Sequence, residues 1–318
     1  RVTVVAVCAY GSCFVRDWMW TSGGWAVSTM LASGGAQPLL RSLGIWTQFQ
    51  GTQVARRQMD ELFDMPQETR SATSSEAGLE GGITFADLDF KYSENSDLLY
   101  RDVNLRVDNG EIIGIAGANG CGKSTMLGLA MGALAPSKGR VLIDDTDVWQ
   151  VDPTVLHRQV CYLPQNGVLF QGTIMDNLTM FSGRHYVERA MYFAERLGLH
   201  EAIGKMAKGY DTPVEFRETA RIPGGVRQRI ALVRALTMTE EPRLLLFDEA
   251  YAQLDRDSDE RLHNLMREFV GKCTMLIVSH RPSYLNLADR VFVVRDGELV
   301  PTSSGARGSM EVLQKEYA

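Results

Sequence analysis

The segment from Gly117 to Ser124 combines the residue types that hold a phosphate group. It reads Gly-Ala-Asn-Gly-Cys-Gly-Lys-Ser and meets the Walker A pattern in full. Glycines let backbone N–H groups turn onto phosphate oxygens, and a helix that follows adds the positive end of its dipole. Lys123 can reach the β- and γ-phosphates, and the Ser124 hydroxyl can bind Mg²⁺. The predicted phosphate contacts are Gly117, Ala118, Asn119, Gly120, Cys121, Gly122, Lys123, Ser124 and Thr125.

A second motif places two acids at the end of an apolar run. Residues 244–247 are Leu-Leu-Leu-Phe, and Asp248 and Glu249 follow. A buried parallel strand delivers such carboxylates to the sheet edge where α/β proteins bind ligands. Asp248 can hold Mg²⁺ directly or through water, and Glu249 can orient or deprotonate an attacking water. An Asp-Glu pair alone is more often a helix cap, but beside a phosphate loop it favours ATP hydrolysis with Mg²⁺.

The elements around the phosphate loop have the order that the motif requires. Residues 111–116 form a short apolar run that leads into the loop, and a helical pattern follows from Lys123 to Ala133. Upstream, Ile83–Phe90 alternates between apolar and polar residues, and Leu98–Val107 is a second extended stretch. The strand, glycine loop and helix together predict an α/β phosphate-loop domain.

The beginning of the chain is different in character. Val2–Val15 and Trp18–Leu40 carry no charged residue, and Arg16 and Asp17 separate the two runs. A membrane span needs about 20 apolar residues, so the second run is long enough. Tryptophans gather where an aromatic belt at a membrane surface would place them, at Trp18, Trp20 and Trp25. We expect membrane helices here, and the alternative is a buried helical hairpin of a soluble domain.

The stretch that follows predicts the domain boundaries. Residues 41–63 keep a loose helical pattern but gain charge, and Arg41, Arg56 and Arg57 place that end in the cytoplasm by the positive-inside tendency. We interpret residues 1–65 as the truncated end of a transmembrane domain with a cytosolic helical extension. Residues 66–82, rich in Gly, Ser, Thr and Glu, are the expected linker, and residues 83–318 the catalytic domain.

Composition narrows the function classes. The net charge is −6 and no long basic run occurs, which argues against a nucleic-acid partner held by a broad basic face. The five cysteines show neither CxxC pairing nor a cluster with histidine at metal spacing. Free thiols of this kind fit a domain in a reducing compartment.

Further motifs stand in a fixed order around the two strong ones. They are Phe90-Lys-Tyr92, Tyr162-Leu-Pro-Gln165, Ala252-Gln-Leu-Asp255 and Val278-Ser-His280. With them, the chain resembles the C-terminal part of an ABC exporter half-transporter. The resemblance implies that Tyr92 stacks on adenine and that Gln165 contacts Mg²⁺. It also implies that His280 acts near the γ-phosphate with Glu249 and Lys123.

The same resemblance implies a fold. We expect a RecA-like α/β core with an antiparallel β subdomain at Ile83–Val107 and a helical subdomain near Thr173–Thr239, preceded by transmembrane helices. It further implies a second half-transporter chain, so that two ATP molecules lie between two such domains. The implied location is the inner (plasma) membrane, crossed several times and in contact with lipid, with the nucleotide-binding domain in the cytoplasm.

Three stretches are similar to exporters of the type I secretion and bacteriocin-processing group. They are Leu163–Leu178, Gly209–Thr212 and Ser279–Ser283. This similarity implies a polypeptide cargo and, with it, a periplasmic adaptor. Lipid or drug cargo is the alternative, because exporters of those compounds share much of these stretches.

One motif departs from the family. The usual signature Leu-Ser-Gly-Gly-Gln reads Ile222-Pro-Gly-Gly-Val226 here. Gly224 and Gly225 can still present N–H groups to a phosphate, which in the family belongs to the partner chain. Pro223 has neither the serine hydroxyl nor an N–H. The change leaves three readings open: a heterodimer, a homodimer with slower sites, or a regulatory half that hydrolyses weakly. A soluble ABC-type ATPase acting on DNA or ribosomes is a further alternative.

Overall fold

The computed structural model describes residues 9, 21–63, 78–215 and 222–302. It divides into two units, residues 1–69 and 70–318, and each is treated by itself. Several predictions fall outside the described residues. These are the uncharged run Val2–Val15, the tryptophans at 18 and 20, and residues 66–77 of the expected linker.

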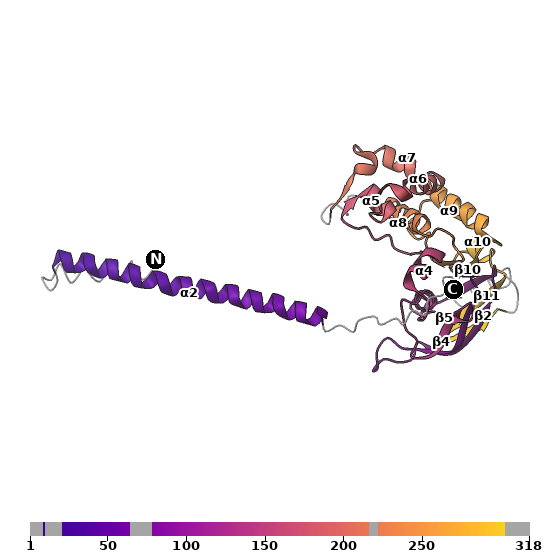
Figure 1. Cartoon of the computed structure of the whole chain (residues 1–318), viewed down its shortest axis with the longest axis horizontal. Helices are drawn as coiled ribbons and strands as arrows, with labels where there is room; N and C mark the ends of the chain where they lie inside the picture. Colours follow the sequence, from indigo (N-terminus) through magenta and orange to yellow (C-terminus); the bar gives the residue numbers. More distant parts are fainter. Residues whose placement is uncertain (1–8, 10–20, 64–77, 216–221, 303–318) are drawn as a thin grey trace. The chain divides into compact units, whose positions relative to one another are not determined.

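The first unit is described as one long helix, α2, which spans Ser22–Phe63 (Figure 1). It includes the stretch 41–63 whose pattern predicts a helix. The Thr21 hydroxyl accepts a hydrogen bond from the Gly24 N–H at 3.2 Å, which occupies one of the free donors at the start of the helix. Across the described residues, no helix combines the length and apolar character that a membrane span requires.

The second unit is built on a six-stranded sheet. Its order is β12-β11-β3-β10-β9-β6, and all neighbours are parallel except β11 and β12. The strands span Ile112–Gly117 (β3), Val160–Leu163 (β6), Leu244–Asp248 (β9), Thr274–Val278 (β10), Arg290–Arg295 (β11) and Glu298–Pro301 (β12).

A second sheet is antiparallel and has the order β2-β1-β4-β5. Its strands are Ile83–Phe90 (β1), Tyr100–Val107 (β2), Lys138–Ile143 (β4) and Thr146–Asp147 (β5). The first two confirm the antiparallel pair expected from residues 83–107. The last two were not predicted, because Lys138-Gly-Arg begins the stretch with three exposed residues and leaves too short an apolar signal.

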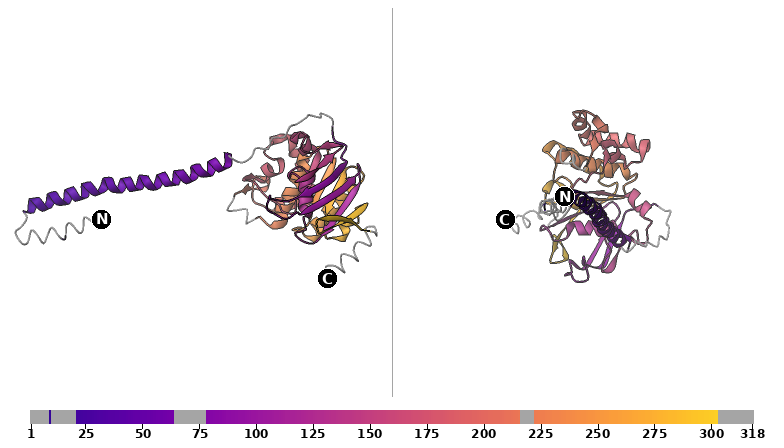
Figure 2. Two further views of the ribbon diagram at one scale, coloured as in Figure 1. Left: turned by 90° about the horizontal axis from the view of Figure 1, so that it is seen from below. Right: turned by 90° about the vertical axis from the view of Figure 1, so that its left-hand side faces the viewer.

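Most of the helices of this unit gather on the side of the parallel sheet away from the antiparallel strands (Figures 1 and 2). Four of them lie in the region where a helical subdomain is expected: α5 (Ile174–Thr179), α6 (Val187–Arg196), α7 (Leu199–Gly204) and α8 (Gly224–Met238). A short antiparallel pair, β7 (Gly172–Thr173) with β8 (Pro213–Val214), belongs to the same region. Thr173 begins α5 through a capping box with Asp176.

The remaining α-helices each follow a strand. They are α3 (Lys123–Ala130), α4 (Pro153–Gln159), α9 (Arg256–Phe269) and α10 (Pro282–Leu285). Of these, α3, α9 and α10 follow strands of the parallel sheet, and α4 follows β5. Asp255 caps α9, because its carboxylate accepts a hydrogen bond from the Ser258 N–H at 2.8 Å. That bond lowers the pKa of Asp255. Asp255 therefore has a structural role as a helix cap, in addition to its place in the Ala252–Asp255 motif.

The parallel sheet separates two hydrophobic cores. In β9, Leu245 and Phe247 pack with the helical group, whereas Leu244 and Leu246 pack with α3 and the antiparallel sheet. This alternation follows from the two-residue period of a strand that is buried on both faces. The parallel register also brings the carboxyl ends of β3, β9 and β10 to one edge, where Asp248 pairs with Val278.

Candidate functional site

The loop between β3 and α3 needs glycine at particular positions. Gly117, Gly120 and Gly122 have φ of 150°, 82° and 110°, a region that favours glycine. A Cβ at Gly117 would lie 2.8 Å from the Cys121 Sγ and 2.9 Å from the Val294 carbonyl oxygen. The glycines that predict a phosphate loop are therefore required by its backbone.

A cavity of about 420 Å³ opens over this loop. Most of the predicted contacts line it, and so does Leu99, which sequence reasoning missed. The lining residues are Tyr92, Leu99, Asn119, Gly120, Gly122, Lys123, Ser124, Thr125, Gln165 and Glu249. Another cavity, of about 460 Å³, lies beside the turn of β4 and β5 and contains none of the predicted residues. The smaller cavity is the candidate site because it holds the lysine and the acid.

Lys123 is held at the mouth of the loop. Its side chain is 7% exposed, and its ammonium donates to the carbonyl oxygens of Gly117 at 3.0 Å and Ala118 at 2.9 Å. The Glu249 Oε1 lies 3.9 Å from the Lys123 Nζ, beyond hydrogen-bond distance. An ammonium has three donors, so one remains for a phosphate oxygen.

Oxygen ligands for a metal come together at the end of β9. The Ser124 hydroxyl donates to the Asp248 Oδ1 at 3.0 Å, although 124 residues separate the two in the sequence. The Tyr162 hydroxyl donates to the other carboxylate oxygen at 3.0 Å. Burial of Tyr162 raises its pKa, which keeps it a donor. Mg²⁺ takes hard oxygen ligands, so the residues present fit the ion that the sequence predicts.

Glu249 is fixed on both of its carboxylate oxygens. The His280 Nε2 lies 3.0 Å from Oε1, and the Gln165 Nε2 donates to Oε2 at 3.3 Å. The backbone of Glu249 has φ of 43°, the left-handed region that costs a residue with a Cβ about 1–2 kcal/mol. Such strain at a residue in a cleft is typical of functional positions.

The aromatic residues near the loop have separate contacts. Tyr92 is 66% exposed, its ring meets Phe90 edge-on at 5.0 Å, and its hydroxyl lies 2.6 Å from the Thr125 Oγ1. An exposed ring at the cavity wall can stack on a base. Tyr100 is fully buried beneath the loop and donates to the Gly122 carbonyl at 2.8 Å. No sequence signal distinguishes it from an ordinary strand residue.

Tyr100→Phe is expected to destabilise the loop from below. The substitution leaves the Gly122 carbonyl without its donor, a loss that costs about 1–3 kcal/mol when the group is buried. Chemical denaturation would measure the free energy of unfolding, and nucleotide titration would show weaker MgATP binding. Tyr192→Phe, at a residue that is 51% exposed on α6, is the control and should change neither. Equal behaviour of the two variants would contradict the role given to Tyr100.

Gly224 and Gly225 lie outside the cavity lining, at the start of α8. Pro223 is the N-cap of this helix and has no side-chain hydrogen bond to give it. A Cβ at Gly224 would lie 2.9 Å from the Gln253 Oε1, and Gln253 also donates to the Asn166 Oδ1 at 3.1 Å. The signature segment Ile222–Val226 therefore lies against Gln253, which follows Glu249 in the chain. Gln253 links it in turn to Asn166, which follows Gln165.

Gln228 adds a second tie from the same helix. It is fully buried, and its amide donates to the Pro164 carbonyl at 2.6 Å and to the Ala250 carbonyl at 3.0 Å. Pro164 precedes Gln165, and Ala250 follows Glu249. The amide nitrogen of one buried side chain thus joins α8 to the segments that contain Gln165 and Glu249.

Comparison with known proteins agrees with this arrangement. Residues 100–252 match the family model described as ABC transporter. Over 271 residues, the chain is 35% identical to the leukotoxin export ATP-binding protein LtxB of Aggregatibacter actinomycetemcomitans and to the alpha-hemolysin translocation ATP-binding protein HlyB of Escherichia coli. Each match covers 85% of this chain and 38% of the relative. The chain therefore spans well under half the length of these relatives.

A solved structure shares the fold. It is described as a bacterial Atm1-family ABC exporter with ATP bound, and it aligns with a TM-score of 0.70 at 25% identity. The alignment covers 93% of this chain and 53% of that one. The phosphate loop and the acidic strand thus lie within the residues that match the ABC transporter family, and the chain is similar in sequence to ATP-binding proteins named for toxin export and translocation.

Proposed function

We propose that this chain binds MgATP over Gly117–Ser124 and hydrolyses it to ADP and phosphate, as the motor of a membrane exporter. The observation that carries the proposal is the meeting of three groups at one sheet edge. These are the buried ammonium of Lys123, the Ser124–Asp248 pair and the Glu249 carboxylate bound to His280. The names of the relatives, which speak of ATP binding and of toxin export, support it.

In the proposed reaction, Lys123 and the loop N–H groups hold the γ-phosphate. Glu249 accepts a proton from the water that attacks phosphorus, and the bond to the β-phosphate oxygen breaks. His280 keeps the Glu249 carboxylate turned toward that water, and Gln165 holds its other oxygen. Ser124, Asp248 and Gln165 would hold Mg²⁺, which supplies positive charge to the phosphates.

Release of phosphate by the purified protein tests the proposal. We expect turnover of MgATP that EDTA removes and that added Mg²⁺ restores, because Ser124 and Asp248 provide ligands for the ion. The same preparation carrying Glu249→Gln gives the background. Phosphate release no greater than this background would overturn the proposed activity.

The site is proposed to be completed by a second chain. Within the described residues, α8 contributes nothing to the lining of the cavity over its own loop. Gly224 and Gly225 are therefore free to face the nucleotide of a partner, in the head-to-tail arrangement that the family resemblance implies. The partner is either a second copy of this chain or a different half-transporter.

Export of a polypeptide is proposed as the work that hydrolysis drives. The leukotoxin and alpha-hemolysin relatives support a protein cargo, and lipid or drug cargo is the alternative. The proposal places residues 1–65 at the end of a membrane domain, in the inner membrane with the nucleotide-binding domain in the cytoplasm. Extraction of membranes at alkaline pH tests this location: the protein should stay in the membrane pellet, and its release would count against the exporter.

Pro223 favours one further interpretation, in which this chain is a half-transporter that stimulates ATP hydrolysis at its partner's site only weakly. Pro223→Ser restores a hydroxyl at the start of α8, and serine is also a preferred N-cap worth about 1 kcal/mol. In a homodimer the substitution should raise the rate of MgATP hydrolysis by about tenfold, since lost transition-state donors cost up to 10²–10³ in rate.

The control for this prediction is Pro242→Ser, in the connection before β9. Steady-state phosphate release by the purified chain alone is the measurement. A rise with Pro223→Ser supports the homodimer, whereas a chain that stays inactive with serine in place indicates that another half-transporter is required.

A further inference from the structure

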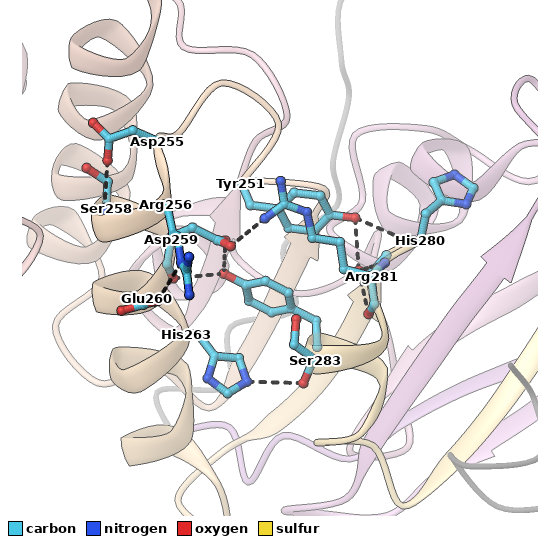
Figure 3. A network of polar contacts seen from close by, with 12 residues as sticks. Tyr251, Asp255, Arg256, Ser258, Asp259, Glu260, His263, His280, Arg281 and Ser283 are labelled. Carbon is cyan, nitrogen blue, oxygen red and sulfur yellow. Dashed lines mark hydrogen bonds and ion pairs between the residues drawn. The ribbon is translucent and has the colours of Figure 1, made fainter.

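The hydroxyl of Tyr251 contacts the backbone of His280. Tyr251 follows Glu249 by two positions and is 5% exposed. The His280 N–H donates to the Tyr251 hydroxyl at 3.0 Å, and this hydroxyl also lies 3.0 Å from the Ser279 Oγ. The Arg281 N–H donates to the Ser279 Oγ at 2.9 Å. The phenol thus contacts Ser279 and His280 directly and is linked to the Arg281 N–H through the Ser279 hydroxyl; Figure 3 shows Tyr251 beside His280 and Arg281.

The ring of Tyr251 is itself fixed. It stacks on the ring of Tyr284 at 5.0 Å and 24°, and the Arg281 guanidinium lies 4.2 Å from its centroid. Both neighbours are held by one residue of α9. Arg281 forms an ion pair with Asp259, and the Tyr284 hydroxyl donates to Asp259 at 2.9 Å. Burial raises the pKa of both tyrosines, so their hydroxyls remain protonated donors.

The imidazole of His280 has little packing of its own. Its side chain is 42% exposed, and in Figure 3 it points away from Tyr251. Its described polar contact is the Glu249 carboxylate, 3.0 Å from Nε2. Residue 280 also lies beyond the last residue of β10, so the sheet ladder does not hold its backbone. The direction of the ring therefore depends on the contacts of the His280 backbone.

We propose that Tyr251 is a positioning residue that sets His280 against Glu249. The segment after β9 then touches His280 twice, through the Glu249 carboxylate at the ring and through the Tyr251 hydroxyl at the N–H. Two contacts from one turn, in which the Ala252 N–H donates to the Glu249 carbonyl at 2.9 Å, thus hold both the ring and the backbone of the histidine. This role rests on the proposed hydrolysis, because it matters only where Glu249 and His280 act together.

Tyr251→Phe tests the role, since it keeps the stacked ring and removes only the hydroxyl. In the whole protein we expect kcat for MgATP to fall about tenfold with KM within twofold, because sub-ångström misplacement of a catalytic group is costly. Tyr284→Phe is the matched control. It removes an equally buried hydroxyl of the same stack that touches Asp259 and not His280, so kcat should stay within twofold.

A double-mutant cycle with His280→Ala separates positioning from a general loss of structure. If Tyr251 acts through His280, then Tyr251→Phe lowers kcat no further once the imidazole is gone. Unchanged kcat in Tyr251→Phe, an equal fall in Tyr284→Phe, or the same factor with and without His280 overturns the proposal. A wild-type protein without Glu249-dependent turnover would instead overturn the proposed function.

Spectroscopy covers the case in which His280→Ala leaves too little turnover to measure. The chain has five histidines, so nitrogen-15 labelling of histidine gives a small set of ring signals, and His280→Ala assigns the one of interest. Tyr251→Phe should move the Nε2 signal of His280, and Tyr284→Phe should leave it in place. An unmoved signal in Tyr251→Phe would overturn the positioning role.

Discussion

Lys123→Ala should lower kcat/KM for MgATP by about 10²–10³, the loss seen when one preorganised donor to a developing negative charge is removed. The ammonium is 7% exposed and sits between two carbonyls of its own loop. Its removal takes away the charge that meets the phosphates, and the Gly117 and Ala118 carbonyls lose their donor. Binding and turnover should therefore both weaken.

Titration with a fluorescent ATP analogue and measurement of phosphate release check this prediction. Lys138→Ala is the control, because Lys138 is an exposed lysine at the start of β4. Its substitution removes the same charge from the chain. It should leave both readings within twofold of the unsubstituted protein. Tight MgATP binding by Lys123→Ala would show that the nucleotide does not lie over this loop.

Glu249→Gln should separate binding from chemistry. An amide has nearly the shape of the carboxylate but does not accept a proton at neutral pH, and loss of a general base costs about 10²–10⁴ in rate. The phosphate contacts at Lys123 and Ser124 do not involve the exchanged atom. The variant should therefore bind MgATP, with kcat reduced by that factor.

The nucleotide that stays with the protein gives the measurement. After incubation with MgATP and rapid desalting, the variant should carry ATP, whereas the unsubstituted protein should carry ADP. Glu241→Gln, at an exposed glutamate that pairs with nearby Arg243, provides the control, since exposed ion pairs contribute little. ADP on Glu249→Gln at the normal rate would assign the base to another residue.

The sequence predicts the parts of the site that depend on local rules. The phosphate loop needs glycines at 117, 120 and 122, because its backbone enters a region closed to other residues. The acids at 248 and 249 follow a wholly buried strand, and a parallel sheet has only one edge at which such residues can meet the loop. The glycine loop and the acidic strand therefore predict the same sheet edge, and both can be found in the sequence alone.

The contacts that support the site were not visible in the same way. Tyr100, Tyr162 and Tyr251 each contact a segment of the candidate site that is distant in the chain, from 22 to 86 residues away. Tyr100 begins β2, Tyr162 lies within β6 and Tyr251 lies in the turn after β9, and no local property marks any of their hydroxyls as a hydrogen-bond partner. Only strand order and register decide which backbone or carboxylate each hydroxyl meets, and these are products of the whole fold.

Some residues that belong to sequence motifs lie outside the cavity. Asp255 was recognised by its place in a family motif, and the structure shows it capping α9. Gly224 and Gly225 were recognised by the same means, and they lie at a helix start away from the cavity of their own chain. A motif thus predicts candidate residues, whereas their distance from the cavity is known only from the structure.

The two-sided burial of β9 has an evolutionary consequence. Leu244 and Leu246 belong to one core and Leu245 and Phe247 to the other, so one inserted residue would exchange the two sets. It would also turn the Asp248 carboxylate away from Ser124. Point substitutions can accumulate slowly in such a strand, but changes of length are eliminated. Insertions and deletions among the descendants of this chain should therefore collect in exposed connections, such as residues 181–185 between α5 and α6.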